Sequence, residues 1–149
     1  GGRRADYRCR NSAFHVRGRS SVPDGDLATI LEEAVTEKLE RLEANCRRNG
    51  IENCRFVQGD IRRHLSSIQT APDVMIIDPP RVGMHKDVVA QVLEIGPEKI
   101  IYVSCNPATL ARDAAMMKDS YTVKEVQPVD MFPHTFHIEC VARLEKITG

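Results

Sequence analysis

The stretch VMIIDPPR, residues 74–81, and the stretch KIIYVSCNPATLARDAAMM, residues 99–117, decide the predicted fold. Each opens with a short run of apolar, mostly β-branched residues and stops at a polar turn that contains proline. Such runs are typical of strands buried inside a parallel sheet, and proline cannot continue the hydrogen-bonded ladder. The second stretch then shows a helical pattern over 108–117. Both stretches therefore predict a buried strand that ends in a loop.

The flanking sequence extends this alternation of strands and helices. Further predicted strands are 28–31, 54–58, 121–129 and 138–144, and further predicted helices are 33–49, 61–68 and 86–95. Such alternation favours a doubly wound α/β sheet, and the last two strands, with no helix between them, favour a terminal antiparallel pair. Residues 1–27 show no period and are rich in arginine, so we expect a basic irregular arm ahead of one domain over 28–149.

Composition excludes several classes of protein. Apolar residues make up 42% of the chain and charged residues 28%, which is enough apolar material for a core and argues against disorder. The formal net charge is zero, which argues against a stand-alone nucleic-acid-binding module. The five cysteines show no C-x-x-C spacing, and no apolar run approaches the length of a membrane span. We therefore expect free thiols and a cytoplasmic protein.

Four reactive side chains fall at predicted strand ends. In doubly wound sheets, ligands bind beyond the carboxyl ends of the strands. Asp60, Asp78 and Cys105 follow three predicted strands, and Glu139 lies at the start of the last one. Because an antiparallel strand starts where its parallel neighbours end, we expect Glu139 at the same edge as the other three.

Cys105 is the candidate nucleophile. It precedes a predicted helix, and the positive end of a helix dipole is expected to lower the pKa of a nearby thiol. The alternative is a buried structural cysteine. Glu139 is a candidate general base, with an exposed edge-strand glutamate as the alternative. Asp78 is held in a stiff Asp-Pro-Pro loop, and its alternatives are a helix cap or an ion pair with Arg81.

Two other chemistries use the histidines near the chain's end. His134, His137 and Glu139 lie within six residues, but no further ligand completes a recognised metal spacing, so we expect no metal site. A cysteine hydrolase would pair Cys105 with His134 or His137 through a thiol–imidazole hydrogen bond. That chemistry would leave Asp78 and Glu139 without a role.

Four stretches together point to a known family. They are Asn49-Gly50 followed by FVQGD at 56–60, DPPR at 78–81, YVSCNPATLARD at 102–113, and VDMFPHTFHIE at 129–139. In this order and spacing they resemble the bacterial 23S rRNA (uracil-5-)-methyltransferases, in the wider RNA 5-methyluridine methyltransferase family. The resemblance covers about residues 28 to 149 and implies a Rossmann-like, S-adenosylmethionine-dependent methyltransferase sheet.

The resemblance also implies residue roles. Cys105 attacks C6 of the uracil, and Glu139 removes the proton from C5. Asp78 lines the cofactor and target-base site, and Asp60 contacts the adenine of S-adenosylmethionine. Glu33, or Glu32 if the count back from the Asn-Gly pair slips by one, binds the ribose hydroxyls.

The partner that the resemblance implies is RNA, with rRNA as the expected target and the target uridine flipped out of its stack. One departure from the family concerns the chain ahead of Glu33, which lacks the family's glycine-rich strand–loop–helix. We therefore expect an N-terminally truncated sheet with an open edge where its first strand is absent. A catalytically inactive fragment or an RNA-binding remnant is the alternative function.

Overall fold

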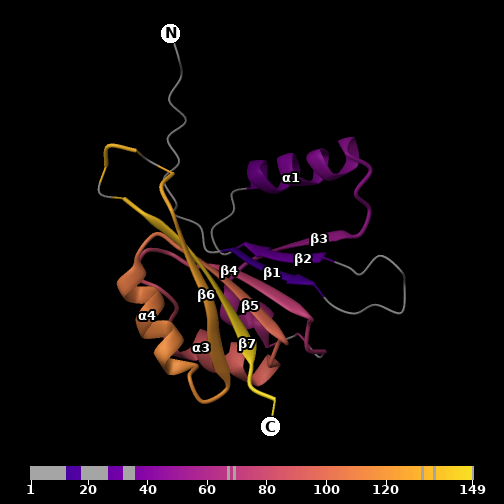
Figure 1. The fold of residues 1–149 in the computed structure, drawn as a ribbon. Helices are drawn as coiled ribbons and strands as arrows, with labels where there is room; N and C mark the ends of the chain where they lie inside the picture. The colour runs from indigo at the N-terminus through magenta and orange to yellow at the C-terminus, as the bar shows by residue number, and fades with distance from the viewer. Residues whose placement is uncertain are drawn as a thin grey trace.

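A computed structural model describes residues 13–17, 27–31, 36–66, 68, 70–131, 133–135 and 137–148. This part of the chain forms one seven-stranded sheet with helices packed against it (Figure 1). The strands are β1 (Ala13–Arg17), β2 (Leu27–Leu31), β3 (Cys54–Gln58), β4 (Val74–Asp78), β5 (Lys99–Ser104), β6 (Tyr121–Val129) and β7 (Glu139–Lys146). The helices are α1 (Thr36–Arg48), α2 (Ile61–Leu65), α3 (Lys86–Ile95) and α4 (Pro107–Met116).

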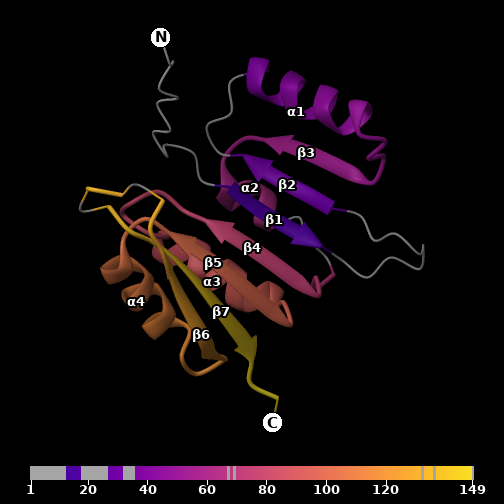
Figure 2. The same ribbon diagram turned by 45° about the horizontal axis from the view of Figure 1, so that its top comes forward.

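The strand order across the sheet is β3-β2-β1-β4-β5-β7-β6. β2 pairs with β3, and β4 with β5, in parallel, whereas β7 is antiparallel to both β5 and β6. This arrangement confirms the predicted α/β sheet with a terminal antiparallel pair. β3 with α1 forms one end of the molecule, and β6 forms the opposite edge of the sheet (Figure 2).

The central strand β1 corrects two expectations. Its residues were expected to belong to an irregular arm, and its position in the sheet was expected to be an open edge. Instead β1 lies between β2 and β4 and pairs antiparallel with both, through Ala13↔Leu31 on one side and Ala13↔Asp78 on the other. Five residues are too few to show a reliable period, and backbone bonds to two neighbours define this strand. The rest of the expected arm, 1–12 and 18–26, lies outside the described residues.

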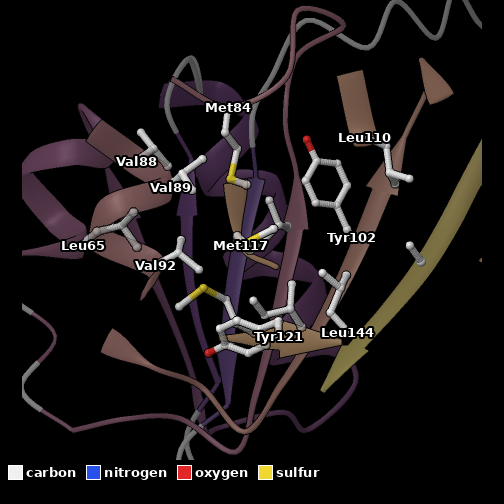
Figure 3. Packing of buried hydrophobic residues seen from close by; sticks show 14 of the residues in the cluster. Leu65, Met84, Val88, Val89, Val92, Tyr102, Leu110, Met117, Tyr121 and Leu144 are labelled. Carbon is white, nitrogen blue, oxygen red and sulfur yellow. The ribbon is translucent and has the colours of Figure 1, made fainter. Parts of the chain in front are cut away.

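The core forms on the sheet face that α2, α3 and α4 cover. The strand side chains on this face are aligned by register and are Met75, Ile77, Ile100, Tyr102, Ala142 and Leu144. The helix side chains packed in the same cluster are Ile61, Leu65, Val88, Val89, Val92 and Leu110 (Figure 3). Fully burying such a side chain contributes about 1.5–3 kcal/mol. The core therefore fixes β4, β5 and β7, whose ends carry the candidate site.

The helix ends also match their local sequence. α3 ends at Gly96, whose φ of 64° is the left-handed conformation that glycine adopts readily, and its N–H donates to the Val92 carbonyl. α4 begins with Pro107 after the cap residue Asn106, whose side chain accepts from the Ala108 N–H. None of the helices in the described part of the chain is long and apolar enough to cross a membrane.

Candidate active site

The candidate site lies at the carboxyl edge of the sheet, which is the edge where β3, β4 and β5 end. β7 starts at this edge, and its register with β5 pairs Ser104 with Cys140. Cys105 directly follows Ser104 and Glu139 directly precedes Cys140, and the charge of Glu139 acts on the Cys105 thiol. Asp78 is the last residue of the neighbouring strand β4. The structure thus brings together Cys105, Glu139 and Asp78 from three strand ends.

The Asp78 carboxyl is perturbed by its surroundings. Burial, and secondarily the negative charge of Glu139, raise its pKa from the ordinary 3.8 to about 6. Strongly perturbed acids clustered at strand ends are typical of functional sites.

Cys105 has a raised pKa, which corrects the expectation that the helix dipole lowers it. Burial contributes most, followed by the negative charge of Glu139. The helix cannot compensate because Asn106 lies between the thiol and α4, and it caps the helix N-terminus itself. Pro107, the first helical residue, has no N–H to offer a thiolate. The local carboxylates and burial therefore outweigh the dipole.

Arg81 is the positive side chain that acts on this thiol, since its charge lowers the pKa of Cys105 against the other effects. Its Nη1 also lies 3.3 Å from Nδ1 of His137, so it joins the loop after β4 to the loop before β7. From the sequence, Arg81 was predicted only as a possible ion-pair partner of Asp78. The signal for its role was its place in the DPPR stretch, three residues after the carboxylate.

The histidines give little support to a cysteine hydrolase. The charged groups that shift the pKa of Cys105 are Glu139, Arg81 and Asp78, with no imidazole among them. His137 meets Arg81 through Nδ1, and the exposed His134 has a φ of 70°. A non-glycine residue in that conformation is uncommon and occurs at turns and functional loops. Among the described residues, no group of three potential metal ligands is found.

Asp60 lies at the same edge but its carboxylate is engaged locally. It caps α2 by accepting from the Arg62 N–H at 3.0 Å, and it accepts from Nε and Nη2 of Arg62 at 3.1 and 2.9 Å. These bonds lower the pKa of the Asp60 carboxyl. Glu33 and Glu32, the expected ribose-binding residues, lie outside the described residues.

A hollow of about 450 Å³ opens between α2, α3, α4 and the loop after β4. Its lining includes Ile61, Pro79, Pro80, Val82 and Arg112. This volume is within the range of small-molecule sites, and the lining is apolar with a few polar groups, as such sites usually are. Ile61, which lines the hollow, directly follows Asp60 in the sequence.

Solved structures define the class of this fold. The chain is similar to a tRNA (uracil-54, C5)-methyltransferase of Pyrococcus abyssi in complex with S-adenosyl-L-homocysteine, with a TM-score of 0.65 and 36% identity. That match covers 75% of this chain and 27% of the other. TrmN from Thermus thermophilus gives a TM-score of 0.58 at 19% identity over 78% of this chain and 35% of that chain, which is a likeness of fold alone. The class is the Rossmann-like methyltransferase fold.

The sequence matches then define the family. The family model described as tRNA (uracil-5-)-methyltransferase matches residues 41–147, so the chain belongs to that family. It is also 50% identical over 117 residues to an uncharacterized RNA methyltransferase of Bacteroides thetaiotaomicron, covering 76% of this chain and 26% of that protein. A second such protein, of Caldanaerobacter subterraneus subsp. tengcongensis, is 45% identical over 118 residues, or 78% of this chain and 25% of that protein. The chain spans about a quarter of the length of these curated relatives.

Proposed function

We propose that this chain is the catalytic part of an S-adenosylmethionine-dependent RNA methyltransferase that methylates uridine at C5, with 23S rRNA as the expected RNA. The observation that carries the proposal is that Cys105, Glu139 and Asp78 gather at the carboxyl edge, close enough for both carboxylates to act on the thiol. Membership of the family and the relatives that are RNA methyltransferases support the same chemistry.

The thiolate of Cys105 forms the first bond. C5 of uracil is a weak nucleophile, and addition of the sulfur at C6 moves the ring's C5–C6 π electrons into an enolate whose C5 can attack. Arg81 is placed to favour the thiolate, against the carboxylates that raise the pKa of Cys105. A thiol of higher pKa is also the stronger nucleophile once it has lost its proton. The target uridine must leave its stack to reach this edge.

Glu139 completes the reaction. After C5 carries the methyl group it still holds a proton, and the Glu139 carboxylate accepts it. The electron pair of that C–H bond re-forms the C5–C6 double bond, and the C6–S bond breaks to return the thiolate. Glu139 lies at the same edge as Cys105 and its charge acts on that thiol, which suits a base acting on the carbon next to the one bonded to sulfur.

The methyl donor, S-adenosylmethionine, would supply an electrophilic methyl group. The described residues fit this donor in part. The hollow beside Ile61, Pro79 and Pro80 has the size of a small-molecule site and lies where the resemblance places the adenine. The Asp60 carboxylate, however, is already bonded to Arg62, and β1 runs antiparallel, so no loop follows it at the carboxyl edge.

Covalent trapping tests the proposal. RNA containing 5-fluorouridine should form a stable protein–RNA adduct, because fluorine at C5 cannot be removed as a proton. The experiment uses the chain completed to the length of a curated relative, with S-adenosylmethionine present. Cys105→Ala should abolish the adduct, whereas Cys46→Ala, a control thiol of intermediate exposure on α1, should leave it. An adduct that survives Cys105→Ala would assign the nucleophile to another residue.

A second candidate function is a catalytically inactive fragment or RNA-binding remnant of such an enzyme. The observation that favours it is again the antiparallel direction of β1. Such a remnant would keep the site residues but would lack measurable affinity for S-adenosylmethionine. Calorimetric titration of the isolated chain separates the two candidates.

A further inference from the structure

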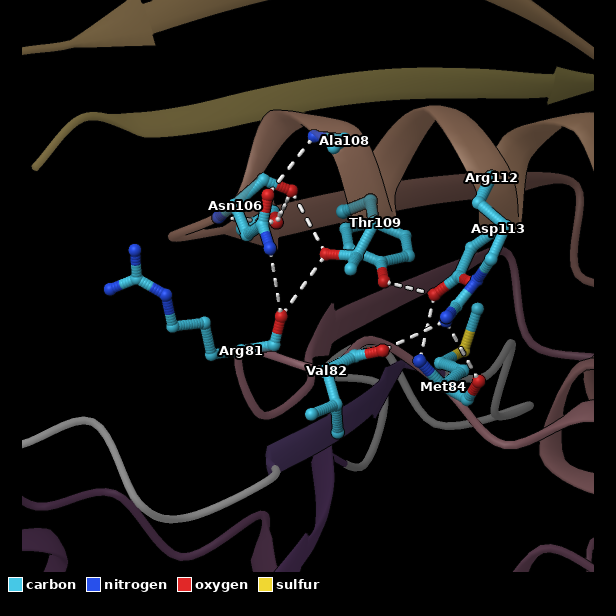
Figure 4. A network of polar contacts seen from close by, with 10 residues as sticks. Arg81, Val82, Met84, Asn106, Ala108, Thr109, Arg112 and Asp113 are labelled. Carbon is cyan, nitrogen blue, oxygen red and sulfur yellow. Dashed lines mark hydrogen bonds and ion pairs between the residues drawn. The ribbon is translucent and has the colours of Figure 1, made fainter.

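The loop after β4 is bonded to helix α4 and its cap residue at Arg81, Val82 and Met84. Its first anchor is the carbonyl of Arg81, to which Nδ2 of Asn106 and Oγ1 of Thr109 each donate at 3.3 Å (Figure 4). Asn106 is also the cap residue of α4, and its backbone N–H donates to Oγ of Ser104 at 3.1 Å. The start of α4 therefore holds both the end of β5 and the main chain of Arg81.

The second anchor is the pair Arg112 and Asp113, one turn further along α4. Nη2 of Arg112 donates to the carbonyl of Val82 at 2.9 Å and to that of Met84 at 3.3 Å. The Met84 N–H donates to Oδ2 of Asp113 at 2.7 Å (Figure 4). Hydroxyl Oη of Tyr102 donates to the same oxygen at 2.6 Å. The loop is thus bonded at Arg81, Val82 and Met84, through three carbonyls and one N–H.

Asp113 is built as an anchor. It is fully buried, and its other oxygen, Oδ1, accepts from Nε and Nη2 of Arg112 at 2.9 and 2.7 Å. All its acceptor capacity is used within the protein, so it is not available to abstract a substrate proton. A buried carboxylate is costly unless it is paired and hydrogen-bonded in this way.

Gly83 shows how closely the loop is packed against this pair. It has a φ of +79°, and a Cβ there would lie 2.5 Å from Nη2 of Arg112 and 2.7 Å from Oδ2 of Asp113. A side chain at this position would displace the two groups that hold the loop. The close approach and the left-handed conformation both require glycine.

We infer that Arg112 and Asp113 are positioning residues that fix the loop carrying Arg81 relative to the helix that follows Cys105. Asp78 precedes this loop directly, and Cys105 lies two residues before α4 begins. A rigid bond between loop and helix therefore sets the separation of Arg81 and Asp78 from the thiol. The inference deepens the proposed function and rests on it, because it assigns supporting residues to the same site.

The reactivity of the Cys105 thiol tests this inference without cofactor or RNA. The rate of alkylation by iodoacetamide is followed against pH in the 149-residue chain, and the peptide containing Cys105 is quantified by mass spectrometry. In Arg112→Gln the loop loses its bonds at the Val82 and Met84 carbonyls, and Arg81 moves away from the thiol. We expect alkylation of Cys105 at neutral pH to be about threefold slower, because reactivity follows the thiolate fraction.

Two matched variants separate positioning from other effects. Arg143→Gln removes another half-exposed arginine that is paired with two carboxylates, Glu125 and Glu145, and it should leave the alkylation profile unchanged. Arg112→Lys keeps the charge but cannot form the forked bonds, so it should restore only part of the rate. Full restoration by lysine would show an effect of charge alone and would overturn the inference.

An unchanged profile in Arg112→Gln, or an equal change in Arg143→Gln, would also overturn it. Thermal unfolding of each variant sets the temperature at which alkylation is measured. If Arg112→Gln does not fold, Thr109→Val serves instead, because it removes a donor to the Arg81 carbonyl without changing the size of the side chain.

Activity supplies an independent readout where the completed enzyme methylates RNA. In Arg112→Gln, kcat should fall about tenfold at an unchanged KM for RNA, since misplaced reacting groups cost rate and not binding. If Arg112→Gln slows alkylation of Cys105 but the unmodified completed enzyme transfers no methyl group, the positioning role of Arg112 and Asp113 is supported and the proposed function is contradicted. The two failures are therefore distinguishable.

Discussion

The half of the sheet formed by β4, β5 and β7 and the half formed by β1, β2 and β3 differ at the carboxyl edge of the sheet. In the first half, three strand ends bring Asp78, Cys105 and Glu139 together. In the second half, β1 runs antiparallel, so Arg17 at its carboxyl end lies at the opposite edge of the sheet. Asp60 is bonded to its own helix. The comparison teaches that the groups proposed for chemistry on a base and those proposed for holding a cofactor depend on different segments.

The direction of β1 can be tested by cross-linking, with an all-or-none result. The antiparallel register pairs Arg17 with Val74 and Ala13 with Asp78. Arg17→Cys combined with Val74→Cys should form a disulfide, because directly opposite residues meet the required separation. A parallel β1 would instead bring position 13 next to position 74. A disulfide in Ala13→Cys with Val74→Cys, mapped by mass spectrometry, would contradict the described direction and remove the difference between the halves.

Cofactor affinity is the next largest effect. The isolated chain should bind S-adenosylmethionine with a Kd well above the micromolar range, and it should not methylate rRNA. Each missing hydrogen bond costs about 0.5–1.5 kcal/mol, so several together weaken binding by orders of magnitude. Isothermal titration calorimetry measures this directly. Micromolar binding by residues 1–149 would show that the second half of the sheet completes the site in spite of β1.

Sequence patterns predicted the half of the sheet with β4, β5 and β7 better than the half with β1, for physical reasons. Short apolar runs that stop at a turn with proline predicted the strands before Asp78 and Cys105, and antiparallel geometry placed Glu139 at the same edge. Strand β1 was missed because its five residues, AFHVR, mix apolar with polar side chains, and its pairing depends on partners distant in the chain.

The raised pKa of Cys105 and the residues that anchor the loop after β4 could not be predicted from the sequence either. The raised pKa of Cys105 depends on burial and on carboxylates from other strands, neither of which a local helix argument contains. Arg112 and Asp113 formed part of a recognised stretch, but nothing in its pattern showed that Asp113 is fully buried and accepts from the Met84 N–H. Such contacts between distant segments appear only when the chain is folded.

A matched pair of core substitutions compares the stability of the two halves. Val92 is fully buried on α3, over the first half, whereas Val57 on β3 is partly buried against the same core. Val92→Ala should lower the free energy of unfolding by about 2 kcal/mol and Val57→Ala by about 1 kcal/mol, since cost scales with the apolar area lost and the cavity left. Urea unfolding of both variants measures this. Equal losses would mean that the halves are equally well packed.

The smallest expected effect concerns two aspartates, one from each half, whose pKa values shift in opposite directions. The pKa of Asp78 is raised from 3.8 to about 6 by burial and by Glu139. Between about pH 4 and pH 6 the folded chain therefore keeps a proton that the unfolded chain releases, so the free energy of unfolding falls as pH rises. Solvent screening limits this loss to at most about 1 kcal/mol. Asp78→Asn should remove it.

Asp60 provides the opposite sign as a control. Its bonds to Arg62 lower the pKa of its carboxyl below 3.8, so its contribution is present above that pH and is lost as pH falls further. Asp60→Asn should therefore leave the change between pH 4 and pH 6 intact, lower stability by a constant amount across that range, and remove the further loss in more acidic solution. The difference between each variant and the unmodified chain, measured by urea unfolding, isolates the contribution of each aspartate. If the fall between pH 4 and pH 6 survived Asp78→Asn, the proton would belong to another group, and Asp78 would not be the acid that Glu139 and burial hold protonated.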